Sequence, residues 1–87
     1  MPHREWLVYM LRCVDGSLYT GMTNNLQRRL QAHASGRGSR YTRSRLPVEL
    51  VWHRHCSSRS EALRLEARIK RMKASAKRTL AESIDEH

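Results

Sequence analysis

The order of apolar and polar residues predicts a β-hairpin near the start of the chain. Residues 6–14 (WLVYMLRCV) are mostly apolar, β-branched or aromatic, which is typical of a strand buried on at least one face. Asp15-Gly16 is a hairpin signal, and residues 17–22 form the returning strand. A two-residue turn would place Tyr9 and Tyr19 on opposite faces of the sheet. We predict instead a three-residue loop over residues 14–16 with a left-handed Gly16, because a site built on both phenols requires one shared face.

A helix is predicted after the polar segment 23–25 (TNN), whose residues suit helix caps, and it continues to about Ser35. At about 100° per residue, one face of this helix carries Leu26, Arg29, Leu30 and His33. Arg28 points away from that face. An arginine turned toward the core requires an anionic partner or a functional site, unless its stem covers the sheet and its guanidinium reaches solvent. His33 on the same face is either a site residue or a hydrogen-bonded histidine of the core.

The rest of the chain predicts a loop, a third strand and two helices, at residues 35–46, 48–56, 58 to about 73, and about 77–83. The segment 35–46 (SGRGSRYTRSRL) is small, polar and basic, which favours a loop. Ser58-Arg59-Ser60-Glu61 has the spacing of a capping box. Residues 74–76 form a weak joint between the two helices, and residues 85–87 are expected to fray.

Glu66 lies at the border of the apolar stripe of the first of these two helices. The stripe consists of Ala62, Leu65, Ile69 and Met72. A carboxylate in this position is expected to be partly buried, so it needs a partner. Either it belongs to a site, or it forms an ion pair with Arg59, Lys70 or an arginine of the sheet.

Length and cysteine content indicate one small domain. At 87 residues the chain is expected to form a single domain over residues 1–87, with a core over about residues 5–80. No apolar run is long enough to span a bilayer, and the N-terminus has no signal-peptide pattern. Cys13 and Cys56 lie in apolar segments and are expected to be buried thiols in a reducing compartment. We expect a cytoplasmic monomer that does not associate with membranes.

The distribution of charge favours a polyanionic partner. The formal net charge is +9, from 17 Lys+Arg against 8 Asp+Glu, and no acidic residue lies between Asp15 and Glu49. Surfaces rich in arginine suit bidentate contacts with phosphate, so we expect a nucleic acid; the alternative is a solvated basic surface without a ligand. The residues expected to contact nucleic acid are Arg28, Arg37, Arg40, Tyr41, Arg43, Arg45, Lys70 and Lys73.

An ordered set of motifs resembles the GIY-YIG nuclease superfamily over about residues 5–80. The residues that carry the resemblance are Leu7-Val8-Tyr9, Tyr19-Thr20-Gly21, Asn25-Leu26, Arg28-Arg29-Leu30, His33 and Glu66. The segment 36–43 (GRGSRYTR), leading into Leu46-Pro47-Val48, is similar to the small stand-alone bacterial members of the YhbQ-like group. The first triplet departs from the family pattern, with Leu7 and Val8 in place of Gly and Ile. The polar residue that often follows the family's glutamate has no clear equivalent here, Lys73 being a weak candidate.

This resemblance implies an α+β fold, a three-stranded antiparallel sheet flanked by helices in the order β-β-α-β-α-α, which agrees with the elements predicted above. It also implies a catalytic set: Tyr9 and Tyr19 as phenols at the site, Arg29 as phosphate ligand, His33 as supporting donor and Glu66 as metal ligand. These types suit phosphodiester hydrolysis. Arginine presents a rigid fork to phosphate oxygens, and Mg²⁺ (or Mn²⁺) often uses only one or two protein carboxylates. Tyr19 is the candidate general base, with Tyr9 orienting Tyr19 or the attacking water.

Two functions from different classes follow from the sequence. The first is a metal-dependent endonuclease that hydrolyses phosphodiester bonds in DNA, with RNA left open, and chooses substrates by structure or loose context. The second is a nucleic-acid-binding module that keeps the nuclease residues without turnover. The basic surface suits both functions, whereas the complete residue set favours the first.

Overall fold

The computed structural model describes residues 5–82 and confirms the predicted α+β fold, with one additional short helix. Its elements are β1 (Trp6–Arg12), β2 (Leu18–Thr23), α1 (Leu26–Ala34), α2 (Arg40–Arg43), β3 (Glu49–Cys56), α3 (Arg59–Lys70) and α4 (Ala74–Glu82). Within the described range, no helix has the length and apolar composition needed to cross a bilayer. The expected fraying of residues 85–87 lies outside the described residues.

The hairpin of β1 and β2 has the predicted three-residue loop at residues 14–16. Tyr19 pairs with Leu11, which lies two residues from Tyr9 and therefore on the same face of β1. Gly16 has φ 86°, the left-handed conformation that this loop needs. Both phenols consequently lie on one face of the sheet, as predicted.

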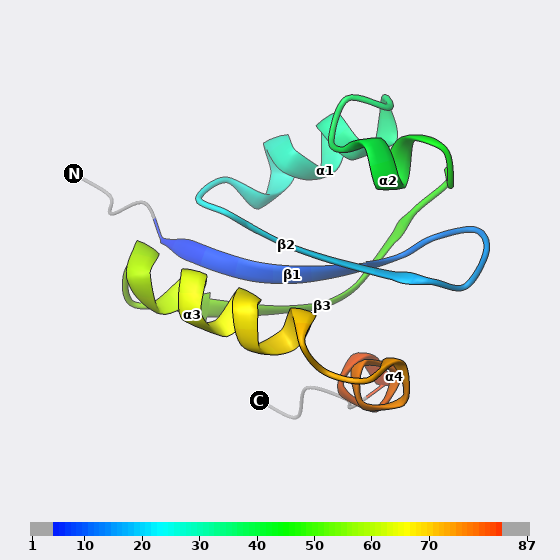
Figure 1. Cartoon of the computed structure of the whole chain (residues 1–87). Coiled ribbons are helices and arrows are strands. Elements are labelled where there is room, and N and C mark those ends of the chain that lie inside the picture. Colours follow the sequence, from blue (N-terminus) through cyan, green and yellow to red (C-terminus); the bar gives the residue numbers. More distant parts are fainter. Residues whose placement is uncertain (1–4, 83–87) are drawn as a thin grey trace.

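The antiparallel sheet has the strand order β2-β1-β3, so β2 is an edge strand. Its two faces carry different helices (Figure 1). One face buries a cluster that joins β1 and β3 to α3: Val8, Met10, Cys56, Ala62 and Ile69. The opposite face holds Tyr9 and Tyr19 beneath α1 and α2. Cys13 and Cys56 are free and buried, as expected.

Helix α1 begins and faces the sheet as predicted. The Asn25 side chain accepts a hydrogen bond from the Arg28 N–H at 3.1 Å, which makes Asn25 the N-cap. His33 is fully buried, Arg29 is half-buried and Arg28 is exposed. The helical periodicity therefore identified which of the two adjacent arginines turns inward.

The prediction of a loop over residues 35–46 was wrong at its centre, where the short helix α2 forms. Ser39 caps this helix by accepting from the Thr42 N–H at 3.1 Å, and the Thr42 side chain is fully buried. A four-residue helix has little stability of its own, so the contact between Thr42 and His33 holds it in place.

The boundaries of the last two helices differ from the prediction. Helix α3 ends at Lys70 rather than about Lys73, because the N–H of Met72 bonds the Ile69 carbonyl three residues earlier and tightens the last turn. Helix α4 begins at Ala74 rather than Lys77. The segment 74–76 contains two alanines, the best helix formers, and belongs to this helix instead of forming a joint.

The capping box at the start of α3 is only half formed. Ser58 Oγ accepts from the Glu61 N–H at 3.1 Å, as the spacing predicts. The Glu61 carboxylate returns to Ser57 rather than to Ser58, and accepts from both the Ser57 N–H and its hydroxyl.

Candidate functional site

Tyr9 and His33 form the buried centre of the candidate site. Both residues are 0% exposed, and the Tyr9 hydroxyl lies 2.9 Å from His33 Nε2. On the other side of the ring, His33 Nδ1 lies 2.8 Å from Thr42 Oγ1. His33 therefore connects β1 to α2, and neither Tyr9 nor His33 reaches the surface.

The hydrogen bonds of this centre form a chain in which each group donates to the next, from Arg29 through Tyr9 and His33 to Thr42. Arg29 Nε donates to the Tyr9 oxygen at 3.4 Å, which leaves the phenol proton for His33 Nε2. Burial, and after it the charge of Arg29, lowers the pKa of His33, so the ring is neutral at pH 7. A neutral imidazole has one donor and one acceptor, so Nδ1–H donates to Thr42. Burial raises the pKa of Tyr9, and the Arg29 hydrogen bond offsets part of that rise, so the phenol stays protonated.

Arg29 is the cation of the site, and it is held by two acceptors. Besides Tyr9, the carbonyl oxygen of Gly38 accepts from one of its terminal nitrogens at 3.1 Å. The hydrogen bond to Tyr9 and, more weakly, the interactions with Tyr19 raise the pKa of Arg29. A guanidinium has five N–H donors, and these contacts orient it while leaving donors for a further anion.

Tyr19 lies at the half-buried rim of the site, inside a group of rings. Its ring centroid is 5.3 Å from that of His33 and 6.1 Å from that of Tyr41, whose plane is inclined by 27°. The Arg45 guanidinium lies 3.8 Å from the Tyr41 centroid and also pairs with Asp15 at 3.0 Å. Tyr41 and Arg45 were both expected to contact nucleic acid. They contact each other, and Tyr41 also stacks near Tyr19 of the site.

Glu66 approaches the other four residues from α3, across the sheet. Its side chain is 17% exposed and its Oε2 lies 3.3 Å from Lys70 Nζ, one of the ion pairs considered from the sequence. Its charge contributes to the raised pKa of Tyr9, so the two groups lie within electrostatic reach. Hydrogen bonds and ring contacts thus bring together four of the predicted site residues, Tyr9, Tyr19, Arg29 and His33. The fifth, Glu66, interacts with Tyr9 only electrostatically.

Gly21 and Gly38 belong to the motifs quoted above, but nothing in those motifs predicted the space that the site requires at these two glycines. A Cβ at Gly38 would lie 2.2 Å from His33 Nδ1, and a Cβ at Gly21 would lie 2.5 Å from the Tyr9 hydroxyl. Thr42 and Ser39 were also missed. The Ser39-x-x-Thr42 spacing was a capping signal, but nothing local indicated that His33 would bury Thr42.

A polar hollow of about 240 Å³ lies beside Arg29, at the N-terminus of α1. It is lined by Thr23, Asn24, Asn25, Arg28, Arg29 and Ala32. Backbone N–H groups at a helix N-terminus favour anions, so this hollow suits a phosphate. Neither phenol lines it, and Glu66 does not line it either.

The other residues expected to contact nucleic acid lie on the surface. Arg37, Arg40, Arg43 and Lys73 are exposed, whereas Lys70 is engaged with Glu66. Among them, Arg40 and Arg43 share the short helix α2, so α2 carries positive charge close to Tyr19.

The donors near Glu66 fit a metal ion only if water and substrate complete its coordination. Within residues 5–82, no group of three or more His, Cys, Asp or Glu side chains could hold a metal. A single carboxylate is a familiar protein ligand for Mg²⁺, which keeps several waters and uses phosphate oxygens. Thr20 lies on the face of β2 that α3 covers, and its buried hydroxyl has no hydrogen-bond partner among the described residues.

The buried His33 predicts a specific dependence of stability on pH. Its folded-state pKa is lowered, so below its ordinary value of 6.5 the unfolded chain takes up a proton that the folded chain resists. We expect the urea midpoint to fall as pH decreases from 7.5 to 5.5. Hydrogen bonds from Ser17 lower the pKa of Asp15, and hydrogen bonds from Ser57 lower the pKa of Glu61. The stabilisation from these two carboxylates is lost only below about pH 4.5, outside the interval in which His33 acts.

The matched control is His33→Gln, which is less stable overall but cannot titrate. Its urea midpoint should change little over the same interval. A wild-type midpoint that stays level, or a His33→Gln midpoint that falls equally, would show that His33 is not the group responsible.

A protein-family model and several relatives match most of the chain. Residues 5–79 match the model described as the GIY-YIG catalytic domain. The chain is 48% identical over 81 residues to a UPF0213 protein of Desulfotalea psychrophila, covering 92% of this chain and 74% of that one. It is 56% identical over 66 residues to a UPF0213 protein of Nitratidesulfovibrio vulgaris, covering 76% of this chain and 60% of the relative.

Two solution structures share the fold over most of the chain. The UPF0213 protein of Bacillus halodurans has a TM-score of 0.58 at 43% identity, covering 87% of this chain and 81% of that one. A protein from E. faecalis has a TM-score of 0.61 at 34% identity, covering 98% and 96%. The chain belongs to the GIY-YIG family, whose catalytic domains are nucleases that act on nucleic acid and generally use divalent metal ions.

Proposed function

We propose that the chain is a metal-dependent endonuclease that hydrolyses phosphodiester bonds in DNA or RNA and selects substrates by structure or loose context. The observation that carries this proposal is the oriented guanidinium of Arg29. It is fixed by Tyr9 and Gly38, adjoins a polar hollow, and belongs to a chain of net charge +9.

Arg29 binds the scissile phosphate in this account. Two of its donors are already held by protein acceptors, so less conformational freedom is lost when a phosphate arrives. The remaining N–H donors would bond the oxygens on which negative charge accumulates as phosphorus is attacked. A preorganised cation of this kind stabilises the transition state more than the ground state.

Tyr19 is the phenol that meets the attacking water. It lies at the half-buried rim, whereas Tyr9 is fully buried. Tyr9 and His33 are therefore positioning residues: Tyr9 holds Arg29, and His33 holds Tyr9 while its ring packs against Tyr19. The Nδ1–H bond to Thr42 fixes the tautomer in which Nε2 accepts the Tyr9 proton.

Glu66 is the residue that would hold Mg²⁺ or Mn²⁺, with water and a phosphate oxygen as further ligands. The bound ion would polarise that phosphate oxygen as a Lewis acid. The Lys70 ammonium occupies one carboxylate oxygen at 3.3 Å, and the exchange of Lys70 for a cation would keep the charge of Glu66 balanced.

A panel of branched, flapped, single-stranded and duplex DNA and RNA substrates, incubated with Mg²⁺ or Mn²⁺, tests this function. We expect cleavage of at least one substrate class by the wild-type protein, stopped by a chelator. Glu66→Ala should cut that substrate at least about 10²-fold more slowly, because Lewis acidity contributes several kcal/mol. A panel left intact, or a Glu66→Ala protein that cuts like wild type, would overturn the proposal.

One observation favours the second candidate, a binding module without turnover: the carboxylate expected to hold metal is paired with a lysine, and within the described residues it belongs to no group of three or more His, Cys, Asp or Glu side chains that could hold a metal. In that case, binding should weaken steeply with salt, stay the same in Glu66→Ala, and occur without cleavage.

A further inference from the structure

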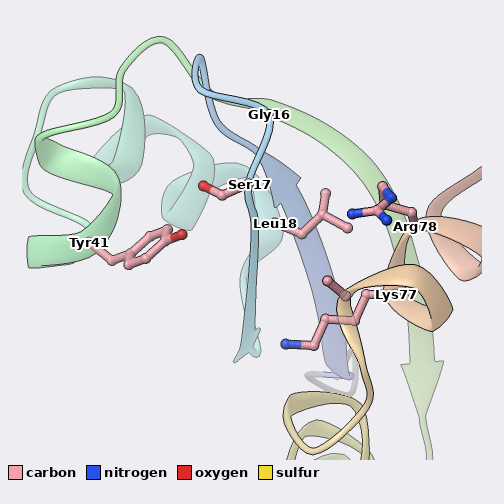
Figure 2. A pocket seen from close by; sticks show the side chains of 7 residues that line it. Gly16, Ser17, Leu18, Tyr41, Lys77 and Arg78 are labelled. Carbon is pink, nitrogen blue, oxygen red and sulfur yellow. The ribbon is translucent and has the colours of Figure 1, made fainter.

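A second hollow, of about 220 Å³, opens at the hairpin end of β2 (Figure 2). Its lining comes from three segments far apart in the sequence: the start of β2, helix α2 and helix α4. The residues are Gly16, Ser17, Leu18, Tyr41, Ala74, Lys77 and Arg78. Tyr41 lies on one side of Ser17 and Leu18 in the figure, and Lys77 and Arg78 lie on the other.

The lining combines cations with an apolar surface. Lys77 and Arg78 supply positive charge, and neither forms an ion pair with an acidic side chain of residues 5–82. Leu18 and Ala74 supply the apolar part. This pairing suits a ligand with a phosphate at one end and a flat or apolar group at the other, which describes one nucleotide unit.

Tyr41 connects this hollow to the candidate site. Its ring lines the hollow and stacks near Tyr19, with 6.1 Å between centroids. A strand whose phosphate is held at Arg29 would pass Tyr19 and Tyr41 before it reached Lys77. The volume is below the roughly 300–1,000 Å³ of pockets for drug-sized ligands, so the hollow suits a single unit of such a strand.

We propose that the hollow between the start of β2, α2 and α4 binds one unpaired nucleotide of the substrate strand, with its phosphate on Lys77 and Arg78. A paired and stacked base cannot enter a concave site without leaving the duplex. The substrate class is therefore nucleic acid with a single-stranded segment on this side of the cleaved bond. This inference rests on the proposed function for its substrate, but its test measures binding alone.

The first test is NMR spectroscopy of the labelled full chain, with the Leu18 and Ala74 methyl groups as reporters. A five-nucleotide single strand, in deoxyribose and ribose forms, should shift both methyl signals. Two such strands annealed as a duplex should leave them unmoved. Signals at α1 that shift while the Leu18 and Ala74 methyl groups stay unmoved would overturn the proposal, as would equal shifts with duplex.

The second test removes the two cations. Lys77→Ala with Arg78→Ala should weaken binding of the deoxyribose strand and reduce the slope of log affinity against log salt by about 0.7, the value for the one phosphate that is no longer neutralised. The charge-matched control is Arg64→Ala with Arg68→Ala, two exposed residues outside the hollow, which should leave the Leu18 and Ala74 shifts in place. A cation-deleted protein that binds as the wild type does would overturn the proposal. If no substrate in the panel is cleaved, the proposed nuclease function is wrong, whereas the two binding tests of the hollow remain valid.

Discussion

Replacement of Arg29 with alanine is expected to slow cleavage of a bound substrate by about 10²–10³-fold, the effect typical of removing one preorganised donor at a developing negative charge. Arg29→Lys keeps the charge but loses the fork that reaches Tyr9, Gly38 and a phosphate together, so it should recover only a small part of the rate. The measurement is the single-turnover rate constant at saturating protein.

The neighbouring Arg28 provides the contrast. It is exposed and lines the polar hollow without touching Tyr9 or Gly38, so Arg28→Ala should act mainly on affinity and its salt dependence. Arg64→Ala, an exposed change of equal charge on α3, controls for the general loss of positive potential. An Arg29→Ala protein that cuts as fast as Arg64→Ala would remove Arg29 from the chemistry.

Gly38→Ala is expected to destabilise the fold by about 2–3 kcal/mol, because a new methyl group would overlap the His33 ring. The added Cβ would lie 2.2 Å from His33 Nδ1 and 2.4 Å from Cγ, and that ring is fully buried and cannot swing outward. Gly38 does not have a positive φ, so the requirement is space rather than backbone conformation. Because the Gly38 carbonyl also holds Arg29, activity should fall together with stability.

A double-mutant cycle isolates this contact. In a His33→Ala background the ring is absent, so Gly38→Ala should cost much less than in the wild type, with a coupling energy above about 1 kcal/mol. Urea denaturation of the four proteins gives that value. Equal costs in both backgrounds would mean that the Gly38 methyl group clashes with something other than His33.

Local patterns were sufficient to predict the hairpin and the inward face of α1. The Asp15-Gly16 pair and the alternation of β1 limited the loop to two choices, and a site on both phenols selected the correct one. Helical periodicity separated Arg29 from Arg28 without any tertiary information.

The features that the sequence did not predict depend on contacts between distant segments. Helix α2 exists because Thr42 bonds His33, and a four-residue helix carries no periodic signal. The amphipathic stripe of α3 predicted that Glu66 is partly buried, as it is, but how close Glu66 comes to the other site residues depends on how α3 docks against the sheet. The engagement of Tyr41 with both Tyr19 and Arg45 likewise follows from the approach of α2 to β2.

The central claim is that Arg29 and Glu66 act on one phosphate. The most direct test is the single-turnover cleavage rate of four proteins: wild type, Arg29→Ala, Glu66→Gln and the double variant. Residues that serve one reacting group are strongly non-additive. We predict that each single variant is slowed by at least about 10²-fold and that the double variant is slower than the slower single by less than about 10-fold. A single variant that cleaves at the wild-type rate, or a double variant whose loss is the full product of the two, would contradict the account.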